Sequence, residues 1–229
     1  NNGKMPKNVR LLCFDTWPDA NVGGATAIAP DVVSIGNTKL ERNVEFIPLS
    51  GDTYPKGEDV IGNRAAHIGQ RISDMGEAYS WFDAPYYRNN TPRATWELSV
   101  GAGMIRQFGR LGFFNHATAI QQQLIRAFTE VHNANPGNDN TQVMVIASFA
   151  GGTGAGMLLD LAAMARSLSS RLGTGGSMFR GIFVLPGAFL LTDQHGAQAM
   201  NARAYAAWRE LARFMNLGPD YGAHTIKYN

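Results

Sequence analysis

One glycine-rich stretch of this sequence could do chemistry through its residue types and spacing: Ala150-Gly-Gly-Thr-Gly-Ala-Gly156. An apolar run over residues 143–147 precedes it, and a pattern typical of a helix follows over residues 157–168. The first turn of a helix leaves backbone amides without partners, and glycine lets a phosphate approach such amides closely. The stretch therefore indicates an anion-binding loop between a strand and a helix. A purely structural strand-to-helix turn is the alternative interpretation.

Two common phosphate-binding patterns do not fit this loop. A Walker A loop needs Lys followed by Ser or Thr after its last glycine, whereas Met157 and Leu158 follow Gly156. The spacing of the glycines also differs from the G-x-G-x-x-G pattern of dinucleotide-binding proteins. A second small-residue stretch lies upstream, where Gly101-Ala-Gly103 is followed by five residues and then by Gly109-Arg110.

Together the two stretches resemble the glycine motifs of the tubulin/FtsZ-like GTPase superfamily. The later one is similar to the signature GGGTG[ST]G and departs from it at Ala150 and Ala155. The earlier one matches the GAG-x5-GR pattern of FtsZ-like proteins in order and spacing. The sequence is most similar to the divergent prokaryotic tubulin-like proteins, and the close matches are confined to these two loops.

This resemblance implies that the chain binds GTP or GDP, with Mg²⁺ held by the nucleotide phosphates. It implies phosphate contacts from both loops, a turn under the nucleotide, a ribose carboxylate (with Gln194 as the alternate) and a guanine-binding Asn. In that order the residues are Ala150, Gly151, Gly152, Thr153, Gly154, Ala155, Gly156, Gly101, Ala102, Gly103, Asp15, Thr16, Asp193 and Asn229. From the residues alone, Asp15 and Thr16 could equally form a turn or cap, and Thr192-Asp193 fits a helix cap better than a ribose site.

The resemblance also carries expectations about the rest of the protein. In the family, a strand, a Gly-x-Gly-Gly-x-Gly loop and a helix precede this region, and a central helix and a second domain follow it. We therefore expect residues 1–229 to be a partial nucleotide-binding domain. Hydrolysis would occur between subunits of a polymer, with acidic residues from a neighbour, so no catalytic residue is assigned. A tubulin-like scaffold that has lost nucleotide binding is the alternative, and a site for another phosphorylated ligand, such as a dinucleotide, is a weaker one.

Composition narrows the classes of function. The 229 residues suffice for one domain with a sizeable core, and the formal net charge of +2 gives no electrostatic case for nucleic acid or membrane surfaces. One cysteine, Cys13, excludes a disulfide framework, and the sequence favours a cytoplasmic protein. His116 and His132 have no partners at ligand spacing, so we expect no metal site on the protein itself.

Hydrophobic periodicity predicts an α/β fold with a mostly parallel sheet and helices on both faces. We expect strands over residues 9–14, 142–148 and 178–185, and a hairpin of 32–35 with 44–47. Helices are expected over residues 58–75, 104–133, 156–171 and 195–215. Gly109 lies inside the second of these helices, where glycine suggests the close approach of another segment. The aromatic stretch 76–98 favours a packed loop or a protein contact over base stacking. The expected core faces of the second and fourth helices are, respectively, Leu111, Phe114, Ile120, Leu124, Phe128 and Val131, and Ala199, Ala202, Tyr205, Ala206, Trp208, Leu211, Ala212 and Met215.

Overall fold

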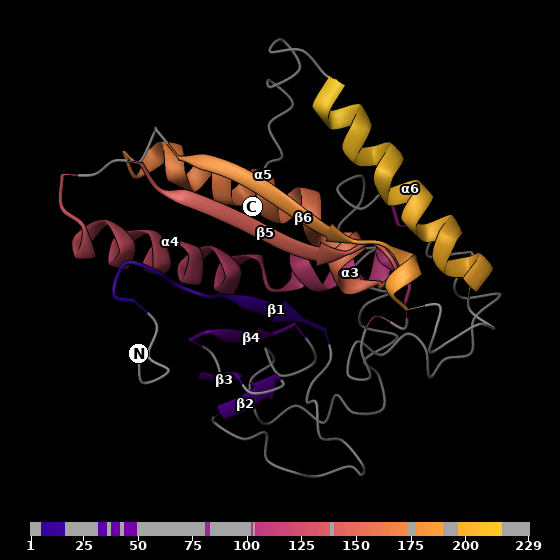
Figure 1. Ribbon diagram of the computed structural model, residues 1–229, viewed down its shortest axis with the longest axis horizontal. Helices are drawn as coiled ribbons and strands as arrows, with labels where there is room; N and C mark the ends of the chain where they lie inside the picture. Colours follow the sequence, from indigo (N-terminus) through magenta and orange to yellow (C-terminus); the bar gives the residue numbers. More distant parts are fainter. Residues whose placement is uncertain are drawn as a thin grey trace.

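A computed structural model of the chain describes residues 6–16, 32–35, 38–41, 44–49, 81–82, 102, 104–137, 140–173, 177–189 and 197–216. The described residues contain both helices and short strands, with parallel pairing in two of the three strand pairs, which confirms the predicted α/β class (Figure 1). The elements are β1 (Cys13–Asp15), β2 (Val32–Ile35), β3 (Thr38–Glu41), β4 (Phe46–Pro48), α3 (Arg106–Asn115), α4 (Ala117–Ala134), β5 (Gln142–Ser148), α5 (Thr153–Arg171), β6 (Met178–Val184), the 3-10 helix η4 (Pro186–Ala188) and α6 (Ala197–Asn216). The predicted helix 58–75 lies outside the described residues.

The unit β5–α5–β6 positions the glycine-rich loop. Strands β5 and β6 pair in parallel, from Gln142 opposite Met178 to Ser148 opposite Val184, as the sequence predicts. In Figure 1 the two arrows lie side by side, and their heads point toward α3. The amide of Phe149 donates to the carbonyl of Val184 at 3.0 Å, so the pairing continues one residue beyond β5. The loop therefore leaves the sheet at the carboxyl end of a firmly paired strand.

A second parallel pair, β1 with β4, brings the first of the described strands to the same region. Cys13, Phe14 and Asp15 lie opposite Phe46, Ile47 and Pro48. The strand predicted over residues 9–14 is thus shorter and ends at Asp15. The predicted hairpin of 32–35 with 44–47 is wrong, because β2 pairs in antiparallel fashion with β3 instead. Only two residues separate β2 from β3 in sequence, which is the length of the commonest hairpin connection.

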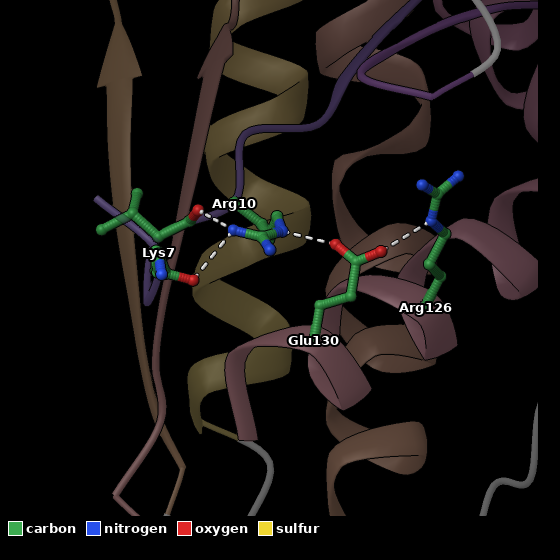
Figure 2. A network of polar contacts seen from close by, with 5 residues as sticks. Lys7, Arg10, Arg126 and Glu130 are labelled. Atoms are coloured by element: carbon green, nitrogen blue, oxygen red, sulfur yellow. Dashed lines mark hydrogen bonds and ion pairs between the residues drawn. The ribbon is translucent and has the colours of Figure 1, made fainter. Parts of the chain in front are cut away.

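The segment before β1 is held against α4 by charged side chains. Figure 2 shows Glu130 of α4 between Arg10 and Arg126, with N–O distances of 2.5 and 2.8 Å. The guanidinium of Arg10 also donates to the carbonyl of Lys7 at 3.0 Å. Hydrogen bonds from the two arginines lower the pKa of the Glu130 carboxyl. This network fixes the approach to β1, whose carboxyl end carries two of the predicted site residues.

The helix predicted over residues 104–133 is wrong in one respect, because it consists of two helices that meet at His116. The backbone of His116 leaves the helical region, with φ −114° and ψ 14°. Its ring nitrogen Nδ1 lies 2.9 Å from the carbonyl oxygen of Gly112, and the side chain is buried. Four residues of the predicted core face are buried, namely Leu111, Ile120, Leu124 and Phe128, whereas Phe114 and Val131 are half-buried.

Two apolar clusters form the core around α5. One joins α4 to α5 through Ile120, Phe128 and Met164, and the other joins α6 to α5 through Phe149, Leu158 and Ala204. The core face predicted for α6 is confirmed at Leu211, which packs against this second cluster, and is wrong for most of its other residues. The buried strip consists of Met200, Ala204 and Ala207, whereas Ala199, Ala202, Tyr205, Trp208 and Met215 are exposed. Small alanines let α6 approach the first turns of α5 closely, which outweighs burial of the larger side chains on the other face.

Two aromatic residues of the stretch 76–98 are described, and both pack on α3. The ring of Phe82 is buried and stacks on Phe108 with centroids 5.9 Å apart. The guanidinium of Arg110 lies 4.7 Å from the ring centroid of Trp81. For these two residues the packed-loop interpretation is confirmed.

Candidate functional site

The glycine-rich loop ends in a helix whose first turn is not capped by a side chain. Helix α5 begins at Thr153, and its N-cap residue Gly152 offers no side chain to the amides that follow. The first hydrogen bond of the helix runs from the amide of Gly156 to the carbonyl of Gly152 at 2.9 Å. The amides of Thr153, Gly154 and Ala155 therefore precede the helical hydrogen-bond ladder. Such a group of amides, at the positive end of the helix dipole, can bind an anion.

Close backbone contact between α3 and α5 fixes the loop in place. A Cβ atom on Gly109 would lie 2.2 Å from the carbonyl oxygen of Gly152, and one on Gly156 would lie 2.1 Å from that of Arg106. Both distances are far shorter than any side chain could accept. The close approach that the sequence predicts at Gly109 is confirmed, and the segment that approaches is the glycine-rich loop itself.

A directed chain of hydrogen bonds joins three of the predicted site segments. The amide of Ala102 lies 2.9 Å from Thr16 Oγ1, which lies 2.5 Å from Thr153 Oγ1, which in turn lies 3.1 Å from Asp15 Oδ1. An amide can only donate, a carboxylate can only accept, and each hydroxyl has one hydrogen. The direction is thereby settled: Ala102 donates to Thr16, Thr16 to Thr153, and Thr153 to Asp15.

This chain ties the carboxyl end of β1 and the residue Ala102 to the first turn of α5. Thr16 is 1 % exposed, so its hydroxyl is removed from water. Hydrogen bonds in such an environment reinforce one another and fix the groups that form them. The structure thus brings together Asp15, Thr16, Ala102 and the loop 150–156. Gly101, Gly103, Asp193 and Asn229 lie outside the described residues.

The two alanines that depart from the family signature face the protein interior. Ala150 and Ala155 are each 4 % exposed, and Ala155 packs in the cluster around Phe149. The amide of Ala150 donates to Ser148 Oγ at 3.1 Å. The methyl group of Ala155 therefore fills core space, and that of Ala150 is hidden from solvent.

Arg110, of the predicted Gly-Arg pair, packs α3 on α5. Its guanidinium donates two hydrogen bonds to the carboxylate of Asp160, at 2.8 and 3.0 Å. Burial raises the pKa of the Asp160 carboxyl, and the hydrogen bonds and charge of Arg110 oppose that rise. A bidentate pair of this kind sets the orientation of the two helices.

Two arginines that the sequence pattern does not single out lie next to the loop. Arg106 Nε donates to the carbonyl of Ala155 at 3.2 Å, and the same guanidinium pairs with Glu210 of α6. Arg203 of α6 donates through Nε to the carbonyl of Ala150 at 3.3 Å. One feature of the sequence could have revealed Arg203: it directly precedes Ala204, a residue of the apolar face of an amphipathic helix, where a charged residue is unusual.

The described residues contain no group of three or more His, Cys, Asp or Glu side chains that could hold a metal ion. Burial raises the pKa of the Cys13 thiol, and the nearby charge of Asp15 raises it further, so this thiol stays protonated. Among the described helices, none is long and apolar enough to cross a membrane.

Comparison with known proteins gives one result that covers nearly the whole chain. The family model described as "Tubulin like" matches residues 3–229. No match was found among curated proteins or among solved structures.

Proposed function

Because this chain belongs to the tubulin-like family, we propose that it binds a guanine nucleotide, GTP or GDP, with the phosphates at the loop 150–156. One observation carries the proposal: the uncapped amides of Thr153, Gly154 and Ala155 sit on a loop that is held rigid from several sides. A preorganised group of amides binds an anion without first having to be ordered, which favours affinity. The choice of guanine rests on the family alone.

The hydrogen-bond chain suggests how the individual residues contribute. The hydroxyl hydrogen of Thr153 is committed to Asp15, and the amide of Ala102 is committed to Thr16. We therefore propose that Asp15, Thr16 and Ala102 act mainly by holding the first turn of α5 in position. The carboxylate of Asp15 lies so near the loop that a Mg²⁺ ion carried by the phosphates would offset its repulsion of them.

The buried alanines bear on the choice between nucleotide binding and a scaffold that has lost it. The departures at positions 150 and 155 gave one reason to suspect loss of binding. Both alanines are buried and Ala155 packs in the apolar cluster around Phe149, so neither methyl group is exposed on the surface of the loop. This observation supports the binding function over the scaffold.

By resemblance to the family, we further propose that the protein self-associates as a cytoskeletal protein of prokaryotic type, and that residues 1–229 form its nucleotide-binding part. Any GTP hydrolysis would then need residues of a neighbouring subunit, and we assign none of the described residues a catalytic role. Cytoplasmic localisation belongs to the same proposal.

Isothermal titration of the full protein with GTPγS and with GDP tests the proposal. Gly151 offers a selective variant, because a Cβ placed on it meets no atom within 4 Å and its φ is not positive. Gly151→Val should keep the fold and place a branched side chain where the phosphates would lie. We expect GTPγS affinity to fall at least about tenfold, the equivalent of about 1.4 kcal/mol.

Ala134→Val, at the exposed end of α4 that is remote from the loop in Figure 1, is the matched control and should leave affinity unchanged. Thermal unfolding of all three proteins verifies that the fold is kept. A wild-type protein that binds neither nucleotide would contradict the proposal and favour the scaffold. Equal affinity in wild type and Gly151→Val would place the nucleotide elsewhere.

A further inference from the structure

Arg203 joins helix α6 to the first peptide of the glycine-rich loop. It is half-buried, and its Nε donates to the carbonyl oxygen of Ala150 at 3.3 Å. Its Nη2 lies 3.4 Å from Met104 Sδ. Met104 has a φ of +62°, which is unusual for a residue with a side chain, and it follows the other predicted phosphate loop. One guanidinium therefore joins Ala150, the first residue of the glycine-rich loop, to Met104, the residue after the stretch 101–103.

The hydrogen bond to Ala150 fixes the direction of the next amide. In a trans peptide the carbonyl and the following N–H point in opposite directions. Since the carbonyl of Ala150 points at Arg203, the N–H of Gly151 points away from α6. The other backbone group of Ala150, its amide, is held by Ser148 Oγ at 3.1 Å.

The hydrogen bond from Arg203 holds this peptide by its carbonyl oxygen. Glycine at position 151 adopts many more backbone conformations than any other residue, so the Ala150–Gly151 peptide can turn over at small cost. A Cβ built on Gly151 would meet no atom within 4 Å, so the space on that side of the residue is open. A reversed peptide would present a carbonyl oxygen, which repels phosphate, where an amide stood before.

We propose that Arg203 is a positioning residue of the phosphate site: it holds the Ala150–Gly151 peptide with the Gly151 amide facing the nucleotide phosphates. This inference rests on the nucleotide-binding function proposed above. Two nitrogens of the guanidinium are used, Nε for the Ala150 carbonyl and Nη2 for Met104 Sδ, so the forked group is needed to make both contacts and α6 must be docked.

Docking of α6 does not itself depend on Arg203. Ala204 and Ala207 pack in the cluster around Phe149 and Leu158. Glu210, farther along the same helix, pairs with Arg106 of α3. The variant Arg203→Met keeps these contacts and the apolar stem of the side chain, so it should fold with α6 in place.

Selective isotope labelling isolates the amide in question. With ¹³C-carbonyl alanine and ¹⁵N-glycine, only amides of Ala–Gly pairs are selected, and the sequence has three: 102–103, 150–151 and 155–156. In the wild-type full protein we expect an order parameter of about 0.85 for the Gly151 amide, falling below about 0.6 in Arg203→Met. The Gly156 amide, inside α5, should stay unchanged. GTPγS affinity should fall about tenfold in the same variant.

Arg213→Met is the matched control, because it removes the same charge from an exposed position on the same helix. It should change neither the Gly151 amide nor the affinity. Arg203→Lys keeps the charge and loses the fork, so it separates positioning from simple attraction. Its affinity should fall together with the order of Gly151.

An ordered Gly151 amide in Arg203→Met overturns the inference, and so does full affinity in any variant whose Gly151 amide is disordered. Failure of the proposed function looks different, because then the wild type itself binds no GTPγS while its Gly151 amide is ordered. Loss of order in Arg203→Met would in that case still support the role of Arg203 in holding the peptide.

Discussion

Replacing Thr16 by valine tests whether the hydrogen-bond chain holds the site together. Valine has nearly the same shape as threonine, so the substitution removes the hydroxyl and leaves the side-chain volume almost unchanged. Thr16 is buried, so water cannot replace the lost hydroxyl. Two hydrogen bonds disappear: the one from the Ala102 amide at 2.9 Å and the one to Thr153 Oγ1 at 2.5 Å.

The expected cost follows from what the change leaves behind. Ala102 is buried, so its amide would lose its partner without gaining water, at about 1–3 kcal/mol. Loss of the bond between the two hydroxyls adds about 1 kcal/mol, because Thr153 keeps Asp15 as an acceptor. We therefore expect Thr16→Val to lower the free energy of unfolding by about 2–4 kcal/mol.

Urea denaturation of the full protein measures this difference. The m-value should stay constant, which shows that the variant unfolds from the same compact state. Thr129→Val, on the exposed side of α4, is the matched control and should change the free energy of unfolding by less than about 0.5 kcal/mol. If Thr16→Val lowers the free energy of unfolding no more than Thr129→Val does, the hydrogen-bond chain does not stabilise the site.

Two further predictions concern the helix contact and the helix junction. Gly109→Ala should destabilise the fold by about 3 kcal/mol or more, because its Cβ would lie 2.2 Å from the carbonyl oxygen of Gly152, and backbone on both sides would have to move; thermal unfolding measures the loss, and a loss below about 1 kcal/mol would contradict the contact. Burial lowers the pKa of His116, although the hydrogen bond to Gly112 opposes this. The contribution of neutral His116 to the stability of the fold is fully present above the unfolded-state pKa of about 6.5. It is lost as the pH falls below that value, because the unfolded chain then binds a proton that the folded protein does not. Urea denaturation between pH 7.5 and 5 should therefore show a smaller pH dependence in His116→Asn than in wild type, whereas the exposed His132→Asn should keep the wild-type slope.

The sequence identified the parts of the site that depend on local rules. Glycine spacing located the loop, and the apolar run before it gave β5 with the bounds that the structure has. Gly109 revealed a close approach, because only a missing side chain permits one. These features can be predicted because each depends on residue types and spacing within a short segment of the sequence.

The features that the sequence did not reveal depend on neighbours that are distant along the chain. The break at His116 follows from a buried ring that hydrogen-bonds to Gly112, and nothing in the helical periodicity marks it. The buried face of α6 was predicted only in part, because α5 packs against the small side chains of Ala204 and Ala207, which hydrophobicity alone cannot indicate. Arg203 was missed for the same reason, since its acceptor lies 53 residues away.

The glycines of the loop can now be separated by what requires each of them. Gly152 and Gly156 are required by packing, because a Cβ on either would lie within 3 Å of backbone atoms of the segment 105–110. Gly154 is close to the limit, at 3.1 Å from the amide of Ser148. Gly151 has open space around it and a φ that any residue can adopt, so neither packing nor backbone strain explains it. A ligand that must approach the backbone at this point would explain it, and this adds to the reason that the uncapped amides of α5 give for looking for the nucleotide phosphates there.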